Sequence, residues 1–172
     1  PRTFSSAASD VYKRQGYQSP EIFEGVTFTV NSISQTTGSF DSYGLNYSNG
    51  SLKIALASDS NAKGYDNKRF ASTFSLDTLD IDVGVLYQTT KKLSTGISEN
   101  GHVVSVKKNV FEKGSIYYQT SSSDIKLESG EQNSFGYTHK ISKVSKVFVH
   151  ASNLESDTKN VDYVSVGFEY KF

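Results

Sequence analysis

The sequence predicts an all-β protein whose antiparallel strands follow one another as an up-and-down transmembrane β-barrel. Two observations lead there: many stretches alternate apolar and polar residues with period 2, and no stretch has a convincing helical period of 3.6. The chain as a whole is also polar: its mean hydropathy is −0.45 and 35% of its residues are hydrophobic. A barrel tolerates this because only every second strand residue meets lipid, whereas a spanning helix needs ~18 consecutive apolar residues.

The clearest alternation ends the chain. One face of this strand carries Val164, Val166, Phe168, Tyr170 and Phe172, and the other carries Ser165, Gly167, Glu169 and Lys171. Aromatic residues at the end of a lipid-facing strand are typical of the girdle of a transmembrane barrel. An edge strand of a soluble β-sandwich is the alternative interpretation.

Earlier stretches repeat the pattern. Asn49 and Gly50 are expected to form a tight hairpin turn between two strands with the same apolar face. The orientation of Lys146–Ser152 stays open, because Val147 and Val149 lie opposite Phe148. The apolar stripes are expected at Val26, Phe28 and Val30; at Tyr43, Leu45 and Tyr47; at Leu52, Ile54 and Leu56; at Phe70, Phe74 and Leu76; at Leu79, Ile81, Val83, Val85 and Tyr87; at Val104, Val106, Ile116 and Tyr118; and at Phe135, Tyr137 and His139.

Connections of two kinds separate about ten predicted strands. Short turns such as Asp77-Thr78 and Ser142–Ser145 are expected to alternate with long polar loops on the other side, as in outer-membrane barrels. The predicted long loops are Ser58–Lys68, Thr89–Gly101, Ser121–Gln132 and Asn153–Asn160.

Residues 1–15 are predicted to be foreign to the protein. Ser5–Gln15 reads as the translation of a transposase-based sequencing adapter, so these residues are left out of the fold prediction. Native sequence is then expected to begin at Gly16 as the downstream part of a longer chain. Removing Arg2, Lys13, Arg14 and Asp10 changes the formal net charge from 0 to −2. This balance does not suggest a nucleic-acid partner, which would require a strongly basic face.

Three segments resemble the general diffusion porins of Gram-negative outer membranes. They are Tyr17–Pro20, Gly136–Lys143 and the ending Val166–Phe172. The resemblance covers residues 17–172 and implies the last ten strands of a sixteen-stranded barrel. It further implies an outer-membrane homotrimer that passes small hydrophilic solutes by diffusion. The terminal series Val164, Val166, Phe168, Tyr170 and Phe172 would serve as the signal for the barrel-assembly machinery.

Function in such a protein would reside in the charges that line the pore. By alternation the pore-lining candidates are Lys53, Arg69, Asp80, Asp82, Lys107, Glu169 and Lys171. Paired acids such as Asp80 and Asp82 on a wet wall more often stay hydrated than bind a cation. The resemblance implies no catalytic site, and no cofactor is expected. A metal site is not expected either, since Cys is absent and His102, His139 and His150 have no metal-ligand spacing.

Two other classes of protein remain open from the sequence. An autotransporter translocator barrel also ends in a strand with a terminal Phe, but carries a secreted passenger upstream. A soluble β-rich binding or adhesion domain could show similar strand spacing, although its second face would then have to be buried.

Overall fold

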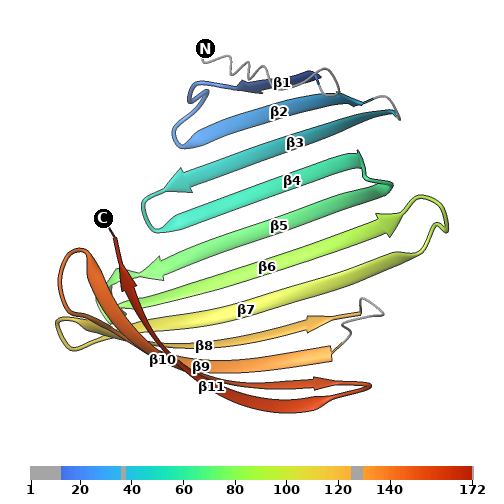
Figure 1. Cartoon of the computed structure of the whole chain (residues 1–172). Helices are drawn as coiled ribbons and strands as arrows, with labels where there is room; N and C mark the ends of the chain where they lie inside the picture. The colour runs from blue at the N-terminus through green and yellow to red at the C-terminus, as the bar shows by residue number, and fades with distance from the viewer. Residues whose placement is uncertain (1–12, 36–37, 125–129, 172) are drawn as a thin grey trace. The chain divides into compact units, whose positions relative to one another are not determined.

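The computed structural model describes residues 13–35, 38–124 and 130–171, and these residues are almost entirely strands (Figure 1). A short 3₁₀ helix, η1 (Asp77–Leu79), is the exception among the named elements. The strands are β1 (Lys13–Gln18), β2 (Val26–Gln35), β3 (Gly38–Asn49), β4 (Leu52–Ala62), β5 (Tyr65–Leu76), β6 (Ile81–Lys92), β7 (Ser98–Val110), β8 (Gly114–Ser123), β9 (Gly130–Lys140), β10 (Ser145–Ser156) and β11 (Asn160–Tyr170).

The strand order within the sheet is the order along the chain, β1 to β11, which is an antiparallel up-and-down topology. The all-β class is therefore confirmed, with eleven strands in the described residues rather than about ten. Val26–Asn31 belongs to β2, which pairs with β1 on one side and with β3 on the other. Lys13, Arg14 and Gln15 belong to the pairing of β1 with β2. Their foreign origin stays a prediction.

The chain divides into two compact units. The first comprises Pro1–Ser72 and Tyr87–Asn100, and the second comprises Thr73–Leu86 and Gly101–Phe172. In the first unit, Leu45 of β3 lies opposite Phe28 of β2 and Leu56 of β4, so the three predicted apolar stripes share one face. In the second unit, Val106 lies opposite Tyr118, as predicted, and Val149 lies between Tyr137 and Val166.

The register of the second unit also settles the orientation of β10. Val147 and Val149 lie on the face of Phe168 and Val166, whereas Phe148 lies opposite Gly167 on the other face. A side chain added at Gly167 would collide with the Phe148 ring. The Phe148 ring therefore fills the space over Gly167. Such a pair of an aromatic residue and a glycine helps to fix the register of the two strands, here β10 and β11.

Three of the predicted long loops are shorter than expected because strands extend into them, and the centre of the fourth, Ser121–Gln132, lies outside the described residues. β4 and β5 are joined by Lys63 and Gly64 alone, within the predicted loop Ser58–Lys68. Likewise β10 runs to Ser156 and β11 starts at Asn160, so only residues 157–159 connect them. Backbone hydrogen bonds hold an extended strand together even where both faces are polar, so strand ends need not follow the apolar alternation.

Two turns differ from the predicted ones. Asn49 ends β3 and pairs with Leu52, so Gly50 and Ser51 form the turn, and Gly50 has the positive φ of 59° that this position favours. Asp80 caps η1 in the left-handed region (φ 54°, ψ 39°) and lies outside β6. Leu79 likewise belongs to η1 and not to a strand.

The described residues contain no buried hydrophobic side chain. Val164 and Val166 are 71% and 80% exposed, and Phe168 and Tyr170 are exposed beside them. By contrast Ser134 and Ser152 are only 3% and 5% exposed. A water-soluble domain is stabilised mainly by burying apolar surface, so this distribution is the reverse of a soluble core. In the described part of the chain, no helix is long and apolar enough to cross a membrane.

Candidate functional site

The strands of the second unit have one apolar and one polar face, and the polar face is the candidate site. The apolar face carries Val147, Val149, Val164, Val166 and Phe168, while the polar face carries Ser134, His150, Ser152, Ser165 and Glu169. Two predicted pore-lining residues, Asp82 and Lys107, meet on this unit as well. Lys107 Nζ lies 3.4 Å from Asp82 Oδ2, and the Ser75 hydroxyl donates to Asp82 Oδ1 at 2.7 Å.

Aromatic rings cover the glycine gaps of the polar face. Tyr117 lies opposite Gly136, and a side chain at Gly136 would collide with the Tyr117 ring. His150 lies opposite Gly136 from the other side, and its Nδ1 is 2.5 Å from the Tyr117 hydroxyl. The two rings stack with centroids 6.0 Å apart, and Tyr163 lies 5.9 Å from His150. The three rings form one layer over the sheet.

A hydrogen-bonded chain continues from this layer to the buried serines. His150 Nε2 lies 2.7 Å from Ser152 Oγ, and Ser152 donates to Ser134 Oγ at 2.7 Å. Because Ser152 uses its hydrogen toward Ser134, its oxygen accepts from His150 Nε2–H, and Nδ1 is left to accept from Tyr117. Gln132 closes the network by donating to Ser134 at 3.2 Å and to the Tyr163 hydroxyl at 2.9 Å.

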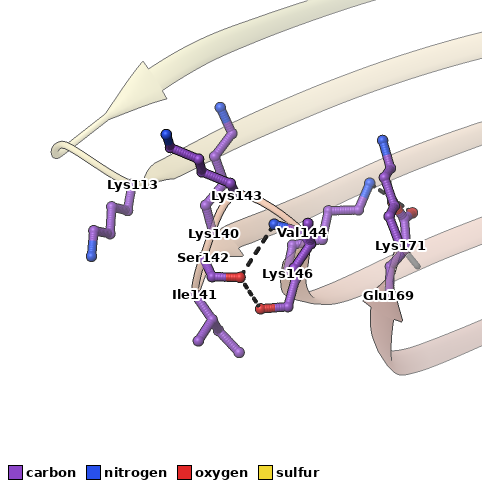
Figure 2. A pocket seen from close by; sticks show the side chains of 10 residues that line it. Lys113, Lys140, Ile141, Ser142, Lys143, Val144, Lys146, Glu169 and Lys171 are labelled. Atoms are coloured by element: carbon purple, nitrogen blue, oxygen red, sulfur yellow. Dashed lines mark hydrogen bonds and ion pairs between the residues drawn. The ribbon is translucent and has the colours of Figure 1, made fainter.

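Two turns, residues 111–113 and 141–144, and the last residues of β11 lie at the same end of the second unit. We call it the basic end because of its lysines. A cavity of about 590 Å³ lies there (Figure 2). Lys146 Nζ and Glu169 Oε2 form an ion pair at 2.8 Å, and Glu169 Oε1 lies 3.9 Å from Lys171 Nζ. The cavity is lined by Lys113, Lys140, Ile141, Ser142, Lys143, Val144, Ser145, Lys146, Glu169 and Lys171.

Three further predicted site residues, Lys53, Arg69 and Asp80, each have surroundings of their own. Lys53 lies on β4 opposite Ser48 and is exposed, and Arg69 Nε on β5 donates to Gln88 Oε1 at 2.9 Å. Asp80 is in a turn, where its carbonyl accepts from the backbone N–H of Asn109. The structure therefore does not place Asp80 beside Asp82 on one strand face. Phe172, the last residue of the predicted assembly signal, lies outside the described residues.

Sequence reasoning missed the Tyr117, His150 and Ser152 network and most of the lysines of the basic end. The spacing of Lys140, Lys143 and Lys146 across one turn was a visible signal, but alternation alone does not show that Lys113 joins them. His139 was expected beside Tyr137, and the Tyr137 hydroxyl is indeed 3.1 Å from His139 Nδ1. No group of three or more His, Cys, Asp or Glu residues in the described ranges could hold a metal ion.

Comparisons with known proteins agree on the fold. No protein-family model and no curated protein matches the chain. Among solved structures, the anion-selective porin from Comamonas acidovorans matches with a TM-score of 0.72 and 18% identity, over 92% of this chain and 59% of that one. The NanC porin matches with a TM-score of 0.55 and 12% identity, over 94% of this chain and 93% of that one. The KdgM porin in complex with disordered oligogalacturonate matches with a TM-score of 0.51 and 13% identity, over 94% and 92%.

The chain thus has the all-β, up-and-down fold of porin barrels. It spans 59% of the length of the anion-selective porin but 93% of the NanC porin. Because these two shares differ, the expectation of a sixteen-stranded barrel stays a prediction. At such low sequence identity the likeness concerns fold, and function has to be argued from the faces of the strands.

Proposed function

We propose that this chain forms part of the wall of an outer-membrane channel through which ions and small hydrophilic solutes diffuse passively. The observation that carries the proposal is the reversed distribution of side chains: exposed valine and aromatic residues on one face, and hydrogen-bonded serine, glutamine and histidine on the other. Such a wall would place its apolar face against lipid and its polar face against water.

The fold supports a membrane location for physical reasons. Inside a bilayer each backbone N–H and C=O must be paired, and the antiparallel meander gives every strand from β2 to β10 a partner on both sides. The exposed stripe of β11, from Val164 to Tyr170, would then face lipid. In this proposal the channel resides in the outer membrane of a Gram-negative bacterium, is inserted by the barrel-assembly machinery and assembles as a homotrimer at full length.

Passive diffusion fits the chemistry of the polar face better than catalysis does. Ser134, Ser152 and His150 are linked in one hydrogen-bonded chain with Tyr117, so their donors and acceptors already serve one another. The face offers an ion pair, hydroxyls and amides to a passing solute. Function would then depend on pore width and lining charge, as in other diffusion channels.

The decisive experiment is reconstitution of the 172-residue chain into lipid. We expect the refolded chain to migrate differently on a gel before and after heating, to produce conductance steps in a planar bilayer, and to admit small sugars into liposomes faster than large ones. Cooperative folding in water without detergent would instead indicate a soluble β-rich domain. An inserted chain that conducts no ions would contradict the channel and favour a translocator barrel.

A further inference from the structure

We infer that the basic end of the second unit binds a small solute bearing several phosphate groups, at the lysine-lined cavity of Figure 2. This inference rests on the proposed channel, since it places the site on the solute-facing side of the wall. It goes beyond passive diffusion because it assigns a ligand class and the residues that recognise it.

The backbone brings the lysines together from three segments that are distant in sequence. The N–H of Lys140 donates to the carbonyl of Lys113 at 2.8 Å, which joins the end of β9 to the β7–β8 turn. The N–H of Lys171 donates to the carbonyl of Val144 at 2.8 Å, which joins the end of β11 to the β9–β10 turn. The cavity is therefore a product of strand pairing and not of one flexible loop.

Charge at this cavity is strongly one-sided. Five lysines and one glutamate line it, so its formal charge is +4. Glu169 pairs with Lys146 and approaches Lys171, and no ion pair is found for Lys113, Lys140 or Lys143 within the described ranges. A net positive charge at one cavity attracts an anion, and the attraction grows with the charge that the anion carries.

The chemistry of the lining suits phosphate groups. Lysine ammonium groups act as compact point charges toward phosphate, and several of them suit a ligand with several negative charges. The Ser142 and Ser145 hydroxyls are 2.7 Å apart, so one donates to the other and the second keeps its hydrogen for a ligand. A volume of about 590 Å³ lies within the range of small-molecule sites.

The face on which the cavity lies favours a dissolved ligand over a lipid headgroup. Lys140, Lys146 and Glu169 lie opposite one another on the polar face, which they share with His150 and Ser165. The lipid-facing stripe of Val147 and Phe168 is on the other side of the same strands. A dissolved anion would reach the polar side directly, whereas a lipid phosphate would approach from the apolar side.

The test measures binding of inorganic tripolyphosphate to the refolded chain in neutral detergent by titration calorimetry at low salt. We expect saturable binding that weakens with salt, as exposed charges are screened. The triple variant Lys113→Gln, Lys140→Gln, Lys143→Gln is expected to lose at least about tenfold in affinity, and Glu169→Gln to gain severalfold. The matched control removes three positive charges elsewhere: Lys91→Gln, Lys92→Gln, Lys159→Gln.

Three results would overturn the inference. The first is absence of saturable tripolyphosphate binding by the chain in detergent. The second is an equal loss in the two triple variants, which would mean that net charge alone attracts the anion. The third is binding to vesicles containing phosphatidylglycerol, dependent on the three lysines, without binding to tripolyphosphate, which would identify a lipid headgroup. Because binding is measured in detergent, it is independent of whether the inserted chain conducts.

Discussion

The two faces of β9–β11 are built from alternate residues of the same strands, yet they are held in place differently. On the polar face, His150 and Ser152 contact neighbours through hydrogen bonds of 2.5–2.7 Å, and Phe148 and Tyr117 fill the spaces over Gly167 and Gly136. On the apolar face, Val164 and Val166 are mostly exposed. The polar face is stabilised by contacts within the protein, whereas in the proposed function the apolar face is covered by lipid.

The largest expected effect comes from a charge on the apolar face. Val166→Lys is expected to destabilise the chain folded in lipid by ~2–4 kcal/mol if the residue lies near mid-bilayer, because the ammonium group would face hydrocarbon. The matched variant Ser165→Lys puts the same charge on the polar face one residue away. Its effect on stability is expected to be small. Urea titration of folding into lipid vesicles measures both, and equal effects would mean that the faces are assigned wrongly.

The next effect concerns the glycine gaps. Gly167→Ala is expected to cost ~1–3 kcal/mol in folding free energy, because the new methyl group would displace the Phe148 ring. Adding Phe148→Leu should restore much of the loss by making room. The same folding titration compares the single and double variants. A single variant as stable as the original chain would show that Phe148 does not pack on Gly167.

A smaller effect is expected in the hydrogen-bonded network. Tyr117→Phe removes the hydroxyl that contacts His150 and is expected to cost ~1 kcal/mol. A double-mutant cycle with His150→Ala isolates the interaction, and a coupling energy of ~0.5–1.5 kcal/mol is expected for a direct hydrogen bond. Strictly additive losses would place the two side chains outside contact.

The smallest effect on stability is expected at the ion pair of Lys107 with Asp82. The two side chains are 48% and 38% exposed, so the pair is expected to contribute no more than ~1 kcal/mol, less at high salt. Lys107→Gln should therefore fold normally but shift the reversal potential of the reconstituted channel toward cations. Val106→Gln, on the opposite face, serves as the control. An unchanged reversal potential would exclude Lys107 from the conducting path.

Much of the fold could be predicted from alternation, and the failures have a common cause. The shared face of Phe28, Leu45 and Leu56 follows directly from period 2, because a shift by one residue would turn every side chain to the other face. The long loops were wrongly predicted where residues are polar on both faces, as in Asp59–Ala62. There backbone pairing continues without an apolar stripe, so the sequence pattern carries no signal of the strand end.

The candidate site was less predictable than the fold. Alternation placed Asp82, Lys107 and Glu169 on a polar face, but it could not tell that Lys107 pairs with Asp82 or that Glu169 pairs with Lys146. It also put Asp80 on a strand, whereas the positive φ at Asp80 ends a 3₁₀ turn. Which residues lie opposite each other on two paired strands depends on the register of the strands. The turn between the strands sets this register, and alternation within one strand does not show it.

The order of residues along each strand is enough to predict which side chains lie on the apolar face and which lie on the polar face. Side-chain direction in an extended chain alternates whatever its neighbours are, so Val166 and Ser165 had to lie on opposite faces. Local alternation does not predict that Phe148 covers Gly167, that His150 joins Tyr117 to Ser152, or that Lys113 lies beside Lys140. Each of these contacts links different strands, and cross-strand distance is fixed by pairing register and turn geometry rather than by local alternation.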